Sequence, residues 1–230
     1  MAVFAIGDLH LSSANPKPMD IFGEEWVDHW NKISSYWMDN VNDTDYIIIP
    51  GDISWAIKLD EAIPDLIKIS NMPGKKVLLQ GNHDYWWSSP SKIRKILPKN
   101  MEIIQNDFVD IGDFYVCGSR GWSLPQDERF SESDDKIYKR ELIRLELSLS
   151  KAAVSSDKPI IVAMHFPPFD DNGKPSMFVD IIKKYNVVSC VYGHLHSYGT
   201  EKAFEGIYEG IEFHLVSCDY IGFKLKKIIS

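Results

Sequence analysis

The chain has 230 residues, of which 44% are hydrophobic and 12% aromatic, and its formal net charge is −8. This composition supports a substantial core and excludes disordered and collagen-like chains, and no apolar run reaches the roughly 20 residues that span a bilayer. Proteins that coat long nucleic acid carry a basic stripe, which this acidic sequence lacks. We therefore expect neither a membrane nor a long nucleic acid as a partner.

The three cysteines, Cys117, Cys190 and Cys218, each lie in or beside an apolar run, and none forms a CxxC pair. They are typical of small buried residues in a reducing compartment, so we expect a cytoplasmic protein. No internal repeat or linker-like segment interrupts the sequence, which predicts a single domain over residues 1–230. The oligomeric state is left open.

The first part of the chain alternates between short apolar runs and stretches with apolar residues three and four positions apart. These patterns are typical of buried strands and amphipathic helices, respectively. They predict strands at 3–6, 46–49 and 77–79, and helices at 26–41, 59–69 and 91–97. Pro64 is expected near the first turn of its helix or at a kink.

The pattern changes after residue 100. Alternation over 101–117, with turn signals inside it, predicts antiparallel strands, and the polar segment 126–135 predicts a mobile loop. The remaining elements are expected as a helix at 137–154, a strand at 160–163, a helix at 178–185, and strands at 187–191, 207–216 and 223–229. The sequence thus predicts a mixed α/β fold with additional antiparallel strands.

Polar residues follow five of the predicted strands at the points where the strands end. Because ligands bind beyond the carboxyl ends of strands in α/β sheets, these residues are expected to converge on one site. They are Asp8, His10, Asp52, Asn82, His83, Asp84, His165, His194 and His196.

These side chains form a mixed nitrogen and oxygen donor set, which suits Mn, Fe, Zn, Co or Ni better than Ca or Mg alone. About eight donors are too many for one tetrahedral ion and fit two ions that share a carboxylate, an arrangement that can bind both oxygens of a phosphoryl displacement. Taken alone, Asp8-x-His10 or Gly51-Asp52 is ordinary loop sequence. Their recurrence at successive strand ends favours a two-metal site.

The ordered set D-x-H, G-D, G-N-H-D, H and G-H-x-H, running from Asp8 to His196, resembles the calcineurin-like metallophosphoesterase family. The resemblance implies a four-layer α/β/β/α sandwich of two mixed sheets with flanking helices. It also implies that the first metal ion is held by Asp8, His10, Asp52 and His196. Asp52 would bridge to a second ion, which is completed by Asn82, His165 and His194.

The resemblance further implies catalytic roles for His83 and Asp84. His83 would stabilise developing charge or protonate the leaving oxygen, and Asp84 would orient it. The nucleophile would be a hydroxide that bridges two transition-metal ions, with manganese expected and Fe, Zn, Co or Ni as alternatives. The expected substrate is a small phosphate ester, either a monoester or a diester of a small molecule or nucleotide.

The sequence differs at two places from particular branches of this family. The run Gly51–Ala56 lacks the arginine of the protein-phosphatase branch, and His83 stands where the lipid-precursor pyrophosphohydrolases carry arginine. Arg120, at a predicted strand end, is a candidate substrate-binding residue, with a surface arginine as the alternative. A further set of aromatic residues either walls a substrate pocket or belongs to the core: Trp55, Tyr85, Trp86, Trp87 and Trp122.

Two other functions share this fold. A nuclease of the same family normally has a basic groove and capping domains, for which this short acidic chain has no candidate segment. A scaffold that has lost catalysis normally loses motif residues, and here every one is present. Both remain alternatives to the small-molecule phosphoesterase.

Overall fold

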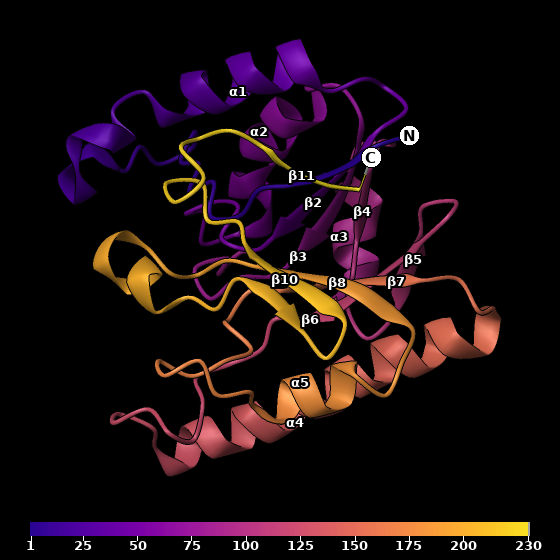
Figure 1. Ribbon diagram of the computed structural model, residues 1–230. Helices are drawn as coiled ribbons and strands as arrows, with labels where there is room; N and C mark the ends of the chain where they lie inside the picture. The colour runs from indigo at the N-terminus through magenta and orange to yellow at the C-terminus, as the bar shows by residue number, and fades with distance from the viewer. Residues whose placement is uncertain (230) are drawn as a thin grey trace.

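The computed structural model describes residues 1–229 and contains two packed β-sheets between outer helices (Figure 1). The first sheet has the strand order β11-β1-β2-β3-β4. β1 to β4 pair in parallel, and β11 is antiparallel to β1 at one edge. The strand bounds are β1 Val3–Ala5, β2 Tyr46–Pro50, β3 Lys75–Leu79, β4 Met101–Ile103 and β11 Lys226–Ile229.

The second sheet has six strands in the order β5-β6-β7-β8-β10-β9. Its four central strands are parallel, and an antiparallel strand lies at each edge. Both sheets are therefore mixed, as expected from the family resemblance. The strand bounds are β5 Phe108–Asp110, β6 Tyr115–Ser119, β7 Ile160–Met164, β8 Val187–Tyr192, β9 Gly206–Tyr208 and β10 Ile211–Leu215.

Helices cover the outer face of each sheet, which confirms the predicted four-layer sandwich. The first sheet is covered by α1 (His29–Asn40), α2 (Leu59–Ser70) and α3 (Pro90–Ile96), and the second by α4 (Glu132–Ser155) and α5 (Met177–Ile182). In the described chain, short 3-10 helices occur at η1 (Asp20–Phe22), η2 (Glu24–Trp26) and η3 (Ser197–Lys202).

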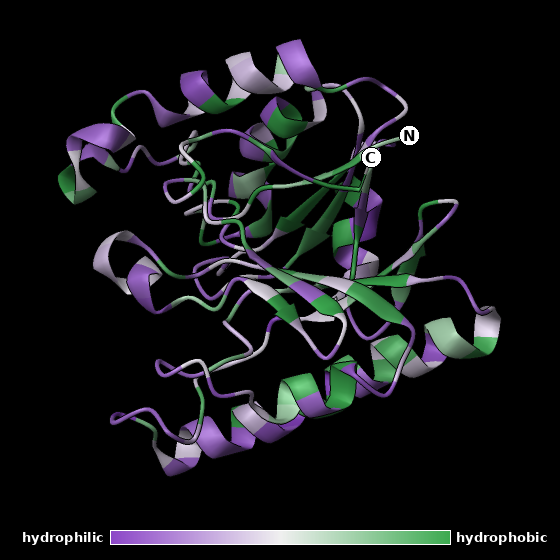
Figure 2. Cartoon of the chain, in the orientation of Figure 1, coloured by the Kyte–Doolittle hydropathy of each residue, from purple (hydrophilic) through white to green (hydrophobic). Residues whose placement is uncertain are grey.

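The core has three layers because strand side chains alternate between the two faces of a sheet. Ile48 of β2 contributes to the cluster between the sheets, whereas Ile47 and Ile49 pack in the cluster beneath α1 and α2. Figure 2 shows hydrophobic residues concentrated on the strands between the helical layers. Strands buried on both faces explain why the sequence shows continuous apolar runs.

The predicted loop 126–135 is shorter in the structure, because α4 already begins at Glu132. Ser131 caps this helix: its hydroxyl accepts the Asp134 amide, and the Asp134 carboxylate accepts the Ser131 amide. This reciprocal capping satisfies amide groups that the first turn of a helix leaves free. The prediction was therefore wrong for 132–135, and the loop is confined to 126–131.

The prediction of antiparallel strands over 101–117 holds for only part of the segment. β4 pairs in parallel with β3 in the first sheet, while β5 and β6 form an antiparallel hairpin in the second. The chain crosses between the sheets here, and alternation alone does not reveal a crossing. Pro64 lies inside α2. The helix predicted from residue 26 begins only at His29, because the chain before it forms η2.

All three cysteines are buried and free. Within residues 1–229, no helix combines the length and the apolar character that a membrane crossing requires.

Candidate metal centre

The parallel strands of both sheets end at one edge, and all seven predicted metal ligands follow these ends. Asp8 and His10 follow β1, Asp52 follows β2, and His165 follows β7. Asn82 follows β3, and His194 and His196 follow β8. Several ligands adopt left-handed backbone conformations, which non-glycine residues seldom adopt and which occur at functional sites. These are Asp8, His10, Asp52 and His194, with φ of 59, 46, 51 and 74°.

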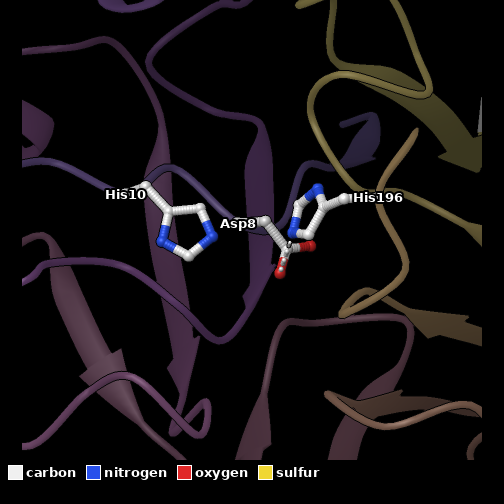
Figure 3. Close-up of side chains that lie close together, drawn as sticks. All are labelled: Asp8, His10 and His196. Carbon is white, nitrogen blue, oxygen red and sulfur yellow. Dashed lines mark ion pairs between the residues drawn. The ribbon is translucent and has the colours of Figure 1, made fainter. Parts of the chain in front are cut away.

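Asp8, His10 and His196 form a first group of potential ligands. Each offers a ligand atom within 4.8 Å of the others. Figure 3 shows the Asp8 side chain between His10 and His196, with its carboxylate next to the His196 ring. His196 Nε2 lies 3.4 Å from Asp8 Oδ1 and has no hydrogen-bond partner in the described chain. A buried nitrogen without a partner and facing a carboxylate is suited to hold a cation.

A second group is centred on His165. Asp8, Asp52 and His165 also offer ligand atoms within 4.8 Å of one another. Asn82 Oδ1 lies 2.6 Å from His165 Nε2 and 2.9 Å from His194 Nδ1. Asp8 and Asp52 therefore lie between the histidines of the first group and those of the second. Either carboxylate is placed where it could bridge two metal ions. The structure brings all seven predicted ligands together.

Partners outside this set orient two of the histidines. His165 Nδ1 lies 3.0 Å from the Pro50 carbonyl oxygen, so it carries the proton and leaves Nε2 free to face Asn82 and Asp52. His196 Nδ1 lies 2.8 Å from Asp219 Oδ1, which likewise leaves Nε2 facing Asp8. Sequence reasoning missed Asp219. The sequence pattern that could have identified Asp219 is the one that identified the ligands, since it is a polar residue that follows an apolar strand, β10.

We expect Asp219→Asn to loosen the metal. The two oxygens of Asp219 accept from His196 Nδ1 and from the Ser197 amide, and an asparagine side chain can accept on only one of these sides. A less well-oriented His196 should raise the rate at which a chelator removes metal by about tenfold or more. Asp180→Asn, at an exposed carboxylate on α5, is the control. Equal stripping rates for the two variants would contradict a positioning role.

Two glycines let the carboxylates pack directly against the backbone. A Cβ atom at Gly81 would lie 2.1 Å from Asp52 Oδ1, and one at Gly193 would lie 2.4 Å from Asp8 Oδ2. Backbone amides close to these glycines then form hydrogen bonds with the same carboxylates. The His83 amide donates to Asp52 Oδ1 at 2.8 Å, and the His194 amide contacts both Asp8 oxygens at 3.1 Å. These bonds fix the carboxylates before any metal binds.

The pKa values of the two aspartates in the site are shifted in opposite directions. Burial raises the pKa of Asp8, but His196 and the other histidines outweigh it, and the pKa lies below its ordinary value. Burial and the neighbouring Asp8 raise the pKa of Asp52 to about 8. Burial lowers the pKa of His196, but Asp8 and Asp219 outweigh it and raise the pKa to about 10. The raised pKa values of Asp52 and His196 favour their protonated forms in the metal-free protein.

Metal affinity is expected to rise with pH. A metal must displace the protons of Asp52 and His196, so between pH 6 and 8 the apparent affinity should increase up to about tenfold per unit for each proton released. Calorimetric titration at pH 7 in buffers of different ionisation enthalpy would count these protons. An affinity that stays constant over this range, with no proton release, would contradict the predicted protonation.

The predicted catalytic pair is only partly as expected. His83 is half-buried, and its ring centroid lies 5.8 Å from that of His10. Asp84 does not orient this ring as predicted: its carboxylate accepts from the amides of Ile53, Ser54 and Gly81 and from the Trp86 indole. His83 Nδ1 has no partner in the described chain. Asp84 therefore holds the loop that carries His83, rather than the imidazole itself.

Arg120 directly follows β6 and is half-buried. Its guanidinium is 3.7 Å from the buried Glu141 carboxylate and 4.5 Å from the ring of Trp122. Its carbonyl oxygen accepts the amides of His165 and Phe166, so the backbone at Arg120 helps to place a ligand. Binding of substrate by its side chain stays a prediction. Of the aromatic residues singled out in the sequence, Trp86 is core and Trp55 stacks on His10 with ring centroids 4.9 Å apart.

A sequence model of the calcineurin-like phosphoesterases matches residues 1–198. The chain belongs to this family. A protein of unknown function from Aquifex aeolicus, AQ665, has a similar structure, with 16% identity, a TM-score of 0.52, and coverage of 98% of this chain and 95% of that one. A phosphopantetheinyl hydrolase from Mycobacterium tuberculosis is similar at 15% identity, a TM-score of 0.58, and coverage of 99% and 95%. No curated protein matches.

At such low identity the two structures support the fold alone, whereas the family match supports a phosphoesterase. Members of the family usually bind divalent metal ions, and the donor groups described above fit such ions. The match ends at residue 198 and therefore does not include Asp219.

Proposed function

We propose that the protein is a metal-dependent phosphoesterase that hydrolyses a phosphate ester of a small molecule or nucleotide at a two-metal site. The observation that carries this proposal is the convergence of seven nitrogen and oxygen donors, with Asp8 and Asp52 positioned between two sets of histidines. Asp8, His10, Asp52 and His196 would hold one ion. Asp52, Asn82, His165 and His194 would hold the other, and manganese is the expected metal.

Bound in these two groups, the ions would stabilise the phosphoryl oxygens as Lewis acids and lower the pKa of the attacking water. His83 lies outside both groups but beside the first, where it can donate a hydrogen bond to an oxygen that gains negative charge. Asp84 keeps the His83 loop in place through its backbone contacts. The protein side chains thus hold the reacting groups in position, and His83 supplies one proton that can be transferred.

The alternative functions have less support. The net charge of −8 is unfavourable for a nuclease that must attract a polyanion. A catalytically silent scaffold has no need to retain the complete donor set together with His83. A small phosphate ester remains the best-supported substrate class.

The purified chain should hydrolyse p-nitrophenyl phosphate or bis-p-nitrophenyl phosphate in the presence of Mn²⁺. It should lose this activity when chelated and recover it when metal is added back. Metal content measured on the same samples connects activity with occupancy. If two ions are bound per chain and no phosphate ester is cleaved, the proposed function is wrong.

A further inference from the structure

Two recesses of unlike chemistry open onto the metal centre. The first, which we call the aromatic recess, has a volume of about 140 Å³ and is lined by His10, Met19, Phe22, Trp26, Trp55, His83, His196 and Ser197. The second, which we call the polar recess, has a volume of about 850 Å³ and includes His194 among its lining residues. No lining residue is common to the two.

The aromatic recess is suited to a flat or apolar group. Trp26 and Met19 are buried, and Phe22, which is 51% exposed, forms part of its edge. Its volume is close to the roughly 150 Å³ of an engineered apolar cavity that holds one benzene ring. His83 lines the same recess, with its ring centroid 4.5 Å from that of Trp55. A group bound here therefore lies next to the residue placed to donate a proton.

The polar recess combines apolar side chains, such as Trp122 and Phe169, with several charged ones. Four carboxylates line it, from Asp127, Glu128, Asp170 and Asp171, against two cations, from Arg129 and Lys202. Lys202 is already paired with Asp171. The recess is therefore unfavourable for an anionic group and favourable for a neutral polar or cationic one. Phe166 borders the recess and lies 4.1 Å, between ring centroids, from the ligand His194.

We infer that the substrate is an unsymmetrical phosphodiester, with an apolar or aromatic arm in the aromatic recess and a neutral polar or cationic arm in the polar recess. The inference rests on the proposed function. A phosphomonoester has one substituent and would fill only one recess. Two recesses that border different ligand histidines provide for two substituents on the same phosphorus.

The position of His83 identifies the departing arm. The water oxygen forms a bond to phosphorus, and the bond between phosphorus and the oxygen of the apolar arm breaks. The electron pair of that bond stays on the departing oxygen, which takes a proton from His83. The attacking water releases one proton to solvent, and His83 is reprotonated from solvent. The products are the apolar alcohol and a phosphomonoester of the polar arm.

Four p-nitrophenyl esters with the same departing group test the inference in the Mn²⁺-loaded protein. They are p-nitrophenyl phosphate and its diesters with choline, with 3-hydroxypropionate and with a second p-nitrophenol. The choline diester should show a kcat/KM at least about tenfold above those of the monoester and the anionic diester. A monoester cleaved as fast as or faster than every diester would overturn the inference and leave the proposed function standing. If no ester were cleaved by the metal-loaded protein, both would fail.

Two variants test the recesses separately. Phe22→Ala should lower kcat/KM for all four esters about tenfold, whereas its exposed neighbour Ile21→Ala, outside the recess, should not. Glu128→Lys should lower the ratio of choline to hydroxypropionate diester cleavage about fivefold, whereas Glu102→Lys, exposed on β4, should leave it unchanged. Unchanged metal content excludes indirect effects on the site. If Phe22→Ala and Glu128→Lys match their controls, the recesses do not bind the two arms.

Discussion

Asp52→Asn should leave the protein unable to retain its metals and lower kcat for any phosphate ester by about a thousandfold or more. Asp52 is 1% exposed and lies close to both histidine sets: its Oδ2 is 3.7 Å from His10 Nε2, and its Oδ1 is 3.5 Å from His165 Nε2. Asparagine keeps the size and one acceptor oxygen but removes the negative charge. Elemental analysis and steady-state kinetics on the same preparation would measure both effects.

The matched control is Asp65→Asn. Asp65 is equally buried, at 1% exposure, and it accepts hydrogen bonds from the Ser13 amide and the Ser54 hydroxyl without being a predicted ligand. This variant should keep its metal, even if it loses stability. If Asp52→Asn bound two ions per chain as tightly as the wild type, Asp52 would not be the bridging ligand.

The same substitution should stabilise the metal-free protein. Burial and Asp8 raise the pKa of Asp52 from 3.8 to about 8, so the folded protein holds this proton more tightly than the unfolded chain does. The carboxyl group therefore costs stability increasingly as the pH rises from about 4 to 8, and asparagine, which does not ionise, avoids that cost. At pH 8 in the presence of chelator, Asp52→Asn should melt at a higher temperature than the wild type. A lower melting temperature would contradict the raised pKa.

Most of the donor set could be predicted from the sequence because its geometry is set by chain direction. Parallel strands that are buried on both faces appear as apolar runs, and the residues after them must gather at one edge. Asp8 and Asp52 follow neighbouring strands of the first sheet, so this rule places them together. His165 follows a strand of the second sheet and joins them because the two sheets pack with these strand ends at the same edge. The four layers were predicted from the family resemblance, because the alternation of strands and helices by itself indicates only a mixed α/β fold.

The unpredicted features depend on contacts that neither periodicity nor motif spacing encodes. Asp219 meets His196 only because β10 pairs in parallel with β8 and brings their ends together. Asp84 was assigned to the His83 ring from its adjacency in sequence, but nearby amides and an indole take up its oxygens. The two recesses are lined largely by segments between the strands and the long helices, such as Phe22 of η1 in the aromatic recess and Asp127 of the 126–131 loop in the polar recess.

His83→Ala should lower kcat about 100- to 1000-fold while both metals remain bound. His83 belongs to neither ligand group, and the contact between its backbone amide and Asp52 survives the substitution. His214→Ala, at a half-buried histidine on β10 that pairs with Glu212, is the control and should retain full activity.

A role as proton donor to the departing oxygen predicts that the loss in His83→Ala depends on the leaving group. An alkoxide needs the proton far more than p-nitrophenolate does, so the variant should be impaired most on alkyl esters and least on p-nitrophenyl esters. Plotting log kcat against the pKa of the leaving alcohol for wild type and variant measures this difference directly. A steeper negative slope in His83→Ala is the expected result. Parallel lines would mean that His83 stabilises charge on the phosphoryl group without donating a proton.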